Sequence, residues 1–414
     1  MIRLLHFADL HLGVENYGRL DPATGLSSRV ADFLRAFDQL VEFALSEHID
    51  LVLFAGDAFK TRTPSPTYQR EFAKRIRRLA VEGAIPTFLL AGNHDLPNAA
   101  GRAHSLEIFQ TLNVENVHVT RKPGMVRIET RSGPVQIIAL PWIVRSAILA
   151  QDAHRSLNLE EIHELMLRRL EELILTGDES LVSQLDPAIP TILAAHSTVQ
   201  GAFYGSERSV MLGSDLILPR SLLQNSAFDY VALGHIHKHQ AISDQPPVVY
   251  SGSLERIDFG EEGEEKGFVV VELARGRADW RFVSLPVRPF VTIRATIGGT
   301  DPTAQVLEAI GSHDIADAVV RLQLKMDAQA EALLDERAVR RALTPAFHVA
   351  AVAKEIDRPT RLRLGGQETI ETLTPRELLQ RYFQAKEIPV ERSSVLLRYA
   401  EDIFADSTQE GGPA

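Results

Sequence analysis

The chain has 414 residues, of which 45% are hydrophobic and 24% charged, and its formal net charge is −11. This composition is typical of a soluble globular protein, and the length favours two domains with an appendage over a single core. The chain has no cysteine, which excludes disulfides and thiolate metal sites, and no apolar run approaches the roughly 20 residues of a membrane span.

The net charge indicates which partners the chain could bind, and its N-terminal residues indicate whether it is secreted. The acidic balance argues against tight DNA binding by this chain alone, because binding to phosphates depends on Lys and Arg. Bound dications or a basic partner subunit would weaken that objection. The N-terminus shows no basic segment followed by an apolar one, so we expect a cytoplasmic protein and not a secreted one.

Residues 1–285 alternate between strand-like and helix-like stretches, which predicts an α/β layered domain. Six short apolar runs indicate strands buried on both faces: LLHFA, LVLFAG, TFLLAG, TILAA, YVALG and VVYSGS. Helices are expected at 29–48, 66–82 and 157–175. The strands GFVVVEL and DWRFVSL flank a turn at 275–277, and the acidic run 261–265 before them is expected to be a solvated loop.

Polar residues able to hold a metal follow five of these six strands. Because the ends of such strands gather along one edge of an α/β sheet, we expect these side chains to converge. Mixed carboxylate, amide and imidazole ligands suit two borderline-hard ions such as Mn²⁺ better than a structural zinc. The residues are Asp9, His11, Asp57, Asn93, His94, His196, His235 and His237.

Two cations about 3.5–4 Å apart would clamp a phosphate and activate a water. Asp57 is the natural bridge between them, since one carboxylate can give an oxygen to each ion. His94 sits beside Asn93 and is placed to give a proton to the departing oxygen. A single DxH or HxH at a strand end is most often a turn, and only the ordered set favours the metal site. The remaining histidines are expected to be structural or exposed: His6, His48, His104, His118, His154, His163, His239, His313 and His348.

The C-terminal third has a different pattern and no metal-type residue at a strand end. We expect a small α/β domain over 286–363, with strands at 291–297, 319–326 and 347–356 and helices at 303–310 and 330–343. A linker over 364–373 and a helical segment over 374–405 follow, and then a disordered tail over 406–414. The helix start at 374 combines an N-cap Thr, a Pro at N1 and a Glu at N3.

The ordered set DLH…GD…GNHD…H…GHIH resembles the calcineurin-like metallophosphoesterase superfamily. The resemblance is closer to the SbcD family of nuclease subunits from bacterial SbcCD complexes. It rests on FADLHLG at 7–13, VLFAGDAFKTRTPSPTYQREF at 52–72, LLAGNHD at 89–95, HSTVQGAFYGSER at 196–208 and YVALGHIHKHQ at 230–240. The small domain and the ELLQRYF helix are similar to the DNA-capping domain and the ATPase-binding tail of that family.

The resemblance implies one metal on Asp9, His11, Asp57 and His237, and a second on Asp57, Asn93, His196 and His235, with His94 as proton donor. It implies two Mn²⁺, with Mg²⁺ as a substitute, and exonuclease and endonuclease activity on DNA in repair, recombination and replication. It also implies a nucleoid-associated homodimer that forms a heterotetramer with an SbcC-type coiled-coil ATPase.

One residue departs from the superfamily pattern. Many members carry His or Asp three residues after the bridging Asp, where this chain has Lys60. The Lys60 side chain could contact a substrate phosphate, but it cannot accept a hydrogen bond from His94. The balance between exonuclease and endonuclease activity is therefore open.

Two other functions stay open, namely a small-substrate or phosphoprotein phosphoesterase and a non-catalytic scaffold for the ATPase. The capping domain and C-terminal helices disfavour the first, and the complete residue set disfavours the second. Apolar residues on and after helix 66–82 are either core or dimer contacts: Tyr68, Phe72, Ile76, Leu106, Ile108 and Phe109. Those of the C-terminal helices either fold back or dock onto the ATPase: Leu378, Leu379, Tyr382, Phe383, Leu396, Leu397 and Phe404.

Overall fold

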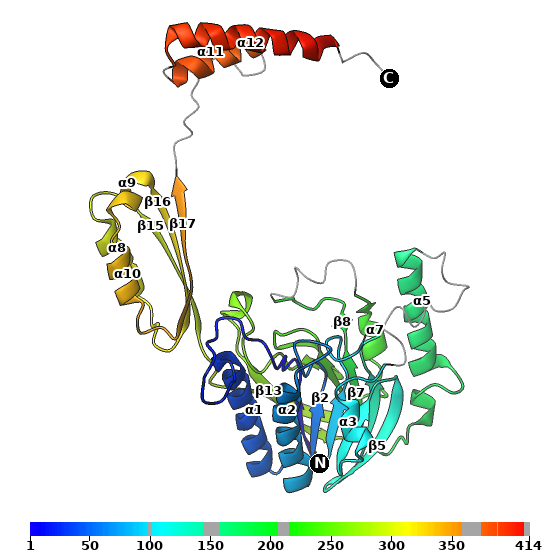
Figure 1. Ribbon diagram of the computed structural model, residues 1–414. Helices are drawn as coiled ribbons and strands as arrows, with labels where there is room; N and C mark the ends of the chain where they lie inside the picture. Colours follow the sequence, from blue (N-terminus) through cyan, green and yellow to red (C-terminus); the bar gives the residue numbers. More distant parts are fainter. Residues whose placement is uncertain (98–101, 144–157, 206–214, 358–373, 387, 410–414) are drawn as a thin grey trace. The chain divides into compact units, whose positions relative to one another are not determined.

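The computed structural model describes residues 1–97, 102–143, 158–205, 215–357, 374–386 and 388–409. Two six-stranded mixed sheets form its centre (Figure 1). The first has the order β14-β13-β1-β2-β3-β4, from Arg277–Ser284, Gly267–Ala274, Ile2–Phe7, Leu51–Phe54, Thr87–Leu90 and Val117–Thr120. The second has the order β11-β12-β10-β7-β6-β5, from Gln240–Asp244, Pro247–Tyr250, Tyr230–Gly234, Thr191–His196, Gly133–Leu140 and Gly124–Thr130.

The two sheets pack face to face, and helices cover their outer faces. Leu53 and Phe88 of the first sheet share one buried cluster with Ile137 and Ile192 of the second. Helices α1 (Ser28–Ser46) and α2 (Pro66–Arg77) cover the first sheet, while α5 (Leu159–Glu171) and α7 (Arg220–Leu223) pack on the second. Strands with two covered faces must be apolar throughout, which is why their sequences are continuous apolar runs. The predicted α/β layered sandwich is confirmed.

The parallel registers bring the strand ends to one edge. Strand β1 pairs in parallel with β2, with Phe7 opposite Phe54, and β2 pairs in parallel with β3. In the second sheet β10 lies parallel to β7 with Gly234 opposite His196. The loops after β1, β2, β3, β7 and β10 therefore leave the sheets at the carboxyl ends of parallel strands, where α/β folds place their sites.

Several elements differ from the sequence prediction. The hairpin of β5 and β6, the edge strands β4 and β11, and the short helix α3 (Glu107–Thr111) had not been predicted. Helix α2 is shorter than expected, because a π-helical turn, Arg78–Glu82, replaces its last residues. The prediction of a single helix at 330–343 is wrong, because two short helices, Ala328–Leu333 and Glu336–Ala342, lie there. Asp335 lies between them and caps the second helix by accepting hydrogen bonds from the backbone N–H groups of Arg337 and Ala338.

The candidate dimer residues on and after α2 are mostly core residues. Phe72, Ile76, Leu106 and Phe109 are buried in the cluster between α1, α2 and the first sheet. Tyr68 packs against the same cluster, and only Ile108 is exposed, at 48%. Core packing therefore accounts for five of these six residues.

The C-terminal part begins with a three-stranded sheet in the order β15-β16-β17, from Phe290–Ile297, Val319–Asp327 and His348–Asp357. Its helices are α8 (Pro302–Gly311), α9 (Ala328–Leu333) and α10 (Glu336–Ala342). Helix α11 (Pro375–Ala385) starts with the predicted Thr374–Glu377 capping box, and α12 runs over Val390–Gln409, beyond the predicted end at 405. The linker 364–373 and the tail residues 410–414 lie outside the described residues.

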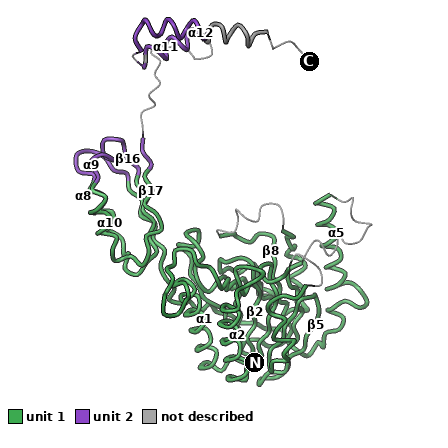
Figure 2. Tube along the Cα trace, viewed as in Figure 1, with its two compact units in different colours: residues 1–295, 303–324, 335–354 green, residues 296–302, 325–334, 355–414 purple. Residues whose placement is uncertain are grey.

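By contacts the chain divides into two compact units (Figure 2). One comprises 1–295, 303–324 and 335–354, and the other 296–302, 325–334 and 355–414. The domain boundaries at 285, 363 and 373 remain predictions. Within the described part of the chain, no helix combines the length and apolar character needed to cross a membrane.

Candidate metal centre

The loops after β1 and β2 run side by side and carry the first three candidate ligands. The backbone N–H of Asp9 donates to the carbonyl of Gly56 at 2.9 Å, and that of His11 donates to the carbonyl of Asp57 at 3.0 Å. Asp9, His11 and Asp57 have positive φ angles of 52°, 45° and 62°, and His235 has one of 96°. A left-handed backbone at residues other than glycine is costly and concentrates at functional sites.

The structure brings the predicted residues together. Asp9, His11 and His237 can each offer a ligand atom within 4.8 Å of the others, and so can Asp9, Asp57 and His196. The Nε2 atoms of His11 and His237 face each other at 3.0 Å. Oδ2 of Asp57 lies 3.6 Å from Nε2 of His11 and 3.4 Å from Nε2 of His196. Asp9 is thus common to both triplets, and Asp57 lies between His11 and His196, where a bridging carboxylate is expected.

Asn93 connects the remaining histidines. Its Oδ1 lies 2.9 Å from Nε2 of His196 and 3.1 Å from Nδ1 of His235. The other nitrogen of His196, Nδ1, donates to the carbonyl of Ala55 at 2.7 Å, so that Nε2 points to the cluster. The outer nitrogen of His235, Nε2, lies 3.1 Å from Oδ2 of Asp215. Outer partners of this kind fix the tautomer and orientation of metal-binding imidazoles.

Two glycines leave room for these side chains. A Cβ on Gly56 would lie 2.3 Å from Nδ1 of His196, and one on Gly92 would lie 2.2 Å from Oδ1 of Asp57. The glycine that precedes Asp57 and the one that precedes Asn93 are therefore steric requirements of the cluster.

The electrostatics indicate a site built for positive charge. Burial raises the pKa of Asp9 to about 6, against the opposing influence of nearby imidazoles. Burial alone would lower the pKa of His196, but the adjacent Asp57 carboxylate raises it to about 9. The Asp57 carboxylate thus favours positive charge at its side. This donor set of carboxylates, imidazoles and one amide, buried and already oriented, fits a divalent cation of borderline hardness.

His94 is half-buried and its orientation comes from two contacts. Its backbone N–H donates to Oδ1 of Asp57 at 2.8 Å, and its ring Nδ1 donates to the carbonyl oxygen of Lys60 at 2.7 Å. The side chain of Lys60 is exposed and makes no part of this contact. The Lys60 side chain cannot accept from His94, as expected, but the structure supplies an acceptor from the backbone of the same residue.

Asp95, the last residue of GNHD, supports the cluster, although no role was assigned to it from the sequence. Its carboxylate is buried and accepts hydrogen bonds from the backbone N–H groups of Asp57 and Gly92, both at 2.9 Å, and of Ala58 at 3.0 Å. Burial and the neighbouring Asp57 raise the pKa of Asp95 to about 7. Asp95 therefore holds the loop that carries Asp57 against the loop that carries Asn93. Its place in GNHD was the available signal.

The acidic run 261–265 is not a fully solvated loop, so that expectation is wrong for its first member. The side chain of Glu261 is fully buried, and its Oε1 accepts a hydrogen bond from Nδ1 of His237 at 2.8 Å. Burial alone would raise the pKa of Glu261, but the Lys266 ammonium and the His237 imidazole hold it well below its usual range. A run of acidic letters gives no sign of which one turns inward.

His239 and His6 are structural, as expected. His239 donates from Nδ1 to the carbonyl of Tyr250 at 2.8 Å and stacks on Phe282 with ring centroids 4.1 Å apart. His6 lies 3.0 Å from the hydroxyl of Tyr230 within the core. Neither belongs to the cluster, although His239 continues the HIHKH run.

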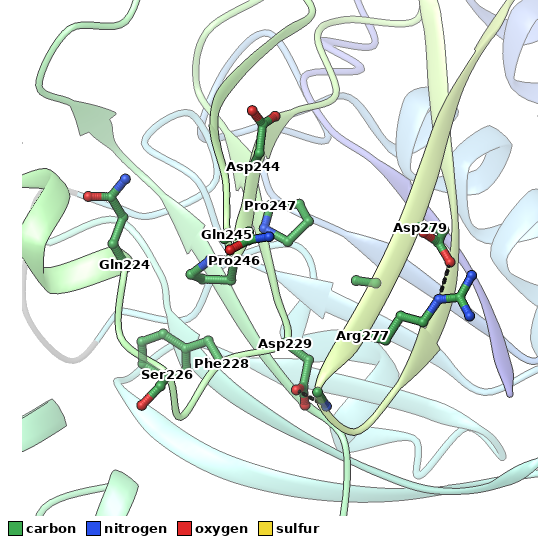
Figure 3. A pocket seen from close by; sticks show the side chains of 12 residues that line it. Gln224, Ser226, Phe228, Asp229, Asp244, Gln245, Pro246, Pro247, Arg277 and Asp279 are labelled. Atoms are coloured by element: carbon green, nitrogen blue, oxygen red, sulfur yellow. Dashed lines mark hydrogen bonds and ion pairs between the residues drawn. The ribbon is translucent and has the colours of Figure 1, made fainter.

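A surface pocket of about 640 Å³ lies at the amino-terminal ends of β10 and β12, the ends opposite the metal cluster (Figure 3). Residues that precede β10, join β11 to β12 and begin β14 line it. Three of its four charged residues are paired: Arg277 bonds Asp279 at 2.6 Å, and Asp229 bonds Arg275 at 2.7 Å. This pocket offers none of the chemistry found at the metal cluster.

The sequence model of the calcineurin-like phosphoesterase family matches residues 2–239, more than half of the chain. Three similar curated proteins are each named as the SbcD component of the nuclease SbcCD. The protein of Rhodobacter capsulatus is 28% identical over 76% of this chain and 77% of its own length. The protein of Bacillus subtilis is 29% identical over 72% of this chain and 73% of its own length. The protein of Escherichia coli K12 is 26% identical over 90% of each chain.

Proposed function

This chain belongs to the calcineurin-like phosphoesterase family, and from that membership we propose that it is a metal-dependent DNA nuclease subunit of the SbcCD type. It cleaves phosphodiesters at double-stranded ends and in single strands or hairpins, in DNA repair, recombination and replication. It acts as a homodimer with an SbcC-type coiled-coil ATPase. The observation that carries the proposal is the similarity to the Escherichia coli nuclease subunit over 90% of both chains.

The extent of that similarity separates the nuclease from the alternatives. The catalytic family matches only residues 2–239, whereas the similarity covers much of the C-terminal part as well. A phosphoesterase for small substrates needs no such part. A scaffold without catalysis has no need to keep a buried, oriented cluster with four strained backbone positions.

We assign one metal to Asp9, His11, Asp57 and His237, and the other to Asp57, Asn93, His196 and His235. Mn²⁺ is the proposed ion and Mg²⁺ its substitute. When bound, the two ions supply Lewis-acid polarisation of the phosphate and a water of lowered pKa. The protein supplies the geometry, since Ala55 and Asp215 orient the imidazoles of His196 and His235.

His94 acts beside the metals as the proton donor to the departing oxygen. Because its Nδ1 bonds the Lys60 carbonyl, Nε2 is the nitrogen that exchanges a proton with the substrate. The ring of His94 packs perpendicular to that of His11 at 4.9 Å, so it lies at the border of the cluster. The exposed Lys60 side chain is proposed to contact a phosphate of the DNA.

The test is cleavage of a labelled hairpin and of a blunt duplex with Mn²⁺, with and without the ATPase and ATP. We expect endonucleolytic cleavage of the hairpin, and ATP-dependent cleavage of duplex ends when the ATPase is present. Hydrolysis of a chromogenic phosphodiester measures the activity of the catalytic site alone, because this small substrate needs neither the ATPase nor contacts to DNA. Efficient turnover of a nucleotide or phosphopeptide, with no cleavage of either DNA, would replace the nuclease with the small-substrate alternative.

The C-terminal helices are proposed to bind the ATPase. Helices α11 and α12 pack against each other, and Phe383 is buried, yet Val390 is 82% and Tyr399 65% exposed. Apolar residues left on the surface of a helix pair mark a helix-in-groove contact.

Truncation after Gly365 should therefore abolish association with the ATPase while Mn²⁺ binding and chromogenic phosphodiester hydrolysis stay intact. Co-purification with the ATPase measures the first effect, and calorimetry and turnover measure the others. As a control that keeps the helices, Val390→Asp combined with Tyr399→Asp should have the same selective effect. A truncated chain that still binds the ATPase would contradict the assignment.

A further inference from the structure

The network behind His237 is buried and charged, and the reaction proposed above does not use it. Lys266 is fully buried, and its ammonium lies 2.8 Å from Oε2 of Glu261 and 2.8 Å from Oε2 of Glu264. The same ammonium donates to the carbonyl of His237 at 3.1 Å. Lysine is almost never buried unless it is paired, so this residue has a specific task.

Glu261 connects that lysine to the imidazole. One carboxylate oxygen accepts from Nδ1 of His237 at 2.8 Å, and the other accepts from Lys266 and from the backbone N–H of Ile257 at 3.0 Å. Both oxygens of the carboxylate are thus occupied, and its position is fixed. Lys266 in turn holds both Glu261 and the backbone carbonyl of His237. The imidazole of His237 therefore cannot rotate without breaking its buried hydrogen bond to Glu261.

The turn that carries Glu261 is anchored on two more sides. Arg256 donates from Nε to the carbonyl of Glu261 at 3.2 Å and from an Nη to the carbonyl of Glu264 at 2.7 Å. Glu262 accepts from the backbone N–H of Thr292 on β15 at 2.7 Å and from its hydroxyl at 2.5 Å. The acidic turn 261–264 therefore links a metal-cluster histidine to the first strand of the C-terminal sheet.

We propose that Glu261 is a positioning residue for metal binding, which with buried Lys266 holds the His237 imidazole with Nε2 toward His11, and that the anchored turn 261–264 keeps it in place. The inference rests on the proposed function, in that His237 holds a metal. A carboxylate behind a metal-binding imidazole fixes its tautomer and raises its basicity as a ligand. Glu261 touches neither the metals nor the substrate in this assignment.

The test is Mn²⁺ binding by the full chain without nucleic acid, in the Glu261→Gln variant. Loss of such an outer partner typically costs about 10–100-fold in metal affinity. We expect that loss at one of two Mn²⁺ positions by calorimetry, with the other unchanged. Electron paramagnetic resonance should change accordingly, from a spin-coupled Mn²⁺ pair to a single ion at limiting metal.

Glu264→Gln is the matched control, because Glu264 bonds the same Lys266 from the same turn, whereas the carboxylate bonded to Nδ1 of His237 is that of Glu261. It should bind both ions as the wild type does. The double variant Glu261→Gln with Lys266→Met removes the ion pair as a whole and guards against misfolding of the single variant. The double variant should bind Mn²⁺ as weakly at one position as Glu261→Gln does. Circular dichroism checks that it is folded.

Two-site binding of wild-type affinity in the double variant would overturn the inference, and so would equal losses in Glu261→Gln and Glu264→Gln. A wild-type chain that binds fewer than two Mn²⁺ would overturn it as well. A wild type that binds two Mn²⁺ but cleaves no DNA would instead overturn the proposed function, because the binding test uses no DNA.

Discussion

Replacement of Asp57 by asparagine is expected to weaken both metal positions together and to abolish measurable phosphodiester cleavage. Asp57 lies 3.6 Å from Nε2 of His11 and 3.4 Å from Nε2 of His196, one histidine from each proposed metal position, and we therefore assign it as the carboxylate that the two positions share. An asparagine keeps the Oδ1 that accepts from the backbone N–H of His94 and loses only the charge and one acceptor oxygen. We expect each Mn²⁺ affinity to fall by more than about 100-fold, beyond the loss typical of an outer-shell change.

Calorimetric titration with Mn²⁺ measures this effect, and His237→Ala provides the comparison. His237 belongs to one ligand group, with Asp9 and His11, so its loss should weaken one ion and leave the other near its original affinity. If Asp57→Asn still binds two ions tightly, or weakens only one, Asp57 is not the bridge.

Replacement of His94 by alanine is expected to lower the rate of DNA cleavage by roughly 10²–10⁴-fold, the usual contribution of a general acid. Mn²⁺ binding should persist, since His94 is assigned as proton donor and not as ligand. The loss should shrink on a nitrophenyl phosphodiester, whose leaving group needs no proton. The measurement is turnover on both substrates beside a Mn²⁺ titration.

Lys60→Ala is the matched control for His94, because it removes an exposed side chain and keeps the carbonyl that orients the imidazole. It should leave the catalytic rate constant largely intact and raise the KM for DNA, as expected for a phosphate contact. Because His94 can also offer a ligand atom beside His11 and Asp57, the titration is decisive. Loss of an ion in His94→Ala would make His94 a ligand.

The layered fold and the convergence of the cluster followed from the sequence for one physical reason. Strands covered on both faces need continuous apolar runs, and parallel strands bring their carboxyl ends to one edge. Asp57 and His196 could therefore be placed together although 139 residues apart in the numbering, from strand patterns alone. The glycines before Asp57 and Asn93 had an equally local cause, since a Cβ would meet the cluster.

What the sequence did not reveal depends on contacts between distant segments. Nothing local distinguishes Glu261 from its acidic neighbours, because only the docking of the turn beneath His237 and Lys266 buries it. The same holds for Phe72 and Ile76, whose helical spacing fits a dimer face as well as a core. The interruption of the helix expected at 330–343 did have a local cause, since Asp335 is a good N-cap.

The cluster also has a mechanical meaning, because its ligands come from both sheets of the sandwich. Asp9, Asp57 and Asn93 follow strands of the first sheet, whereas His196, His235 and His237 lie at or after the ends of strands of the second. Ions held between them would cross-link the two sheets as a disulfide would, in a chain that has no cysteine. At a free metal concentration 100 times the dissociation constant, binding of one ion would stabilise the folded chain by about 2.7 kcal/mol. The melting temperature of this protein would then report metal occupancy as much as the quality of its core, and a chelator would act on it as a reductant acts on a disulfide-linked protein.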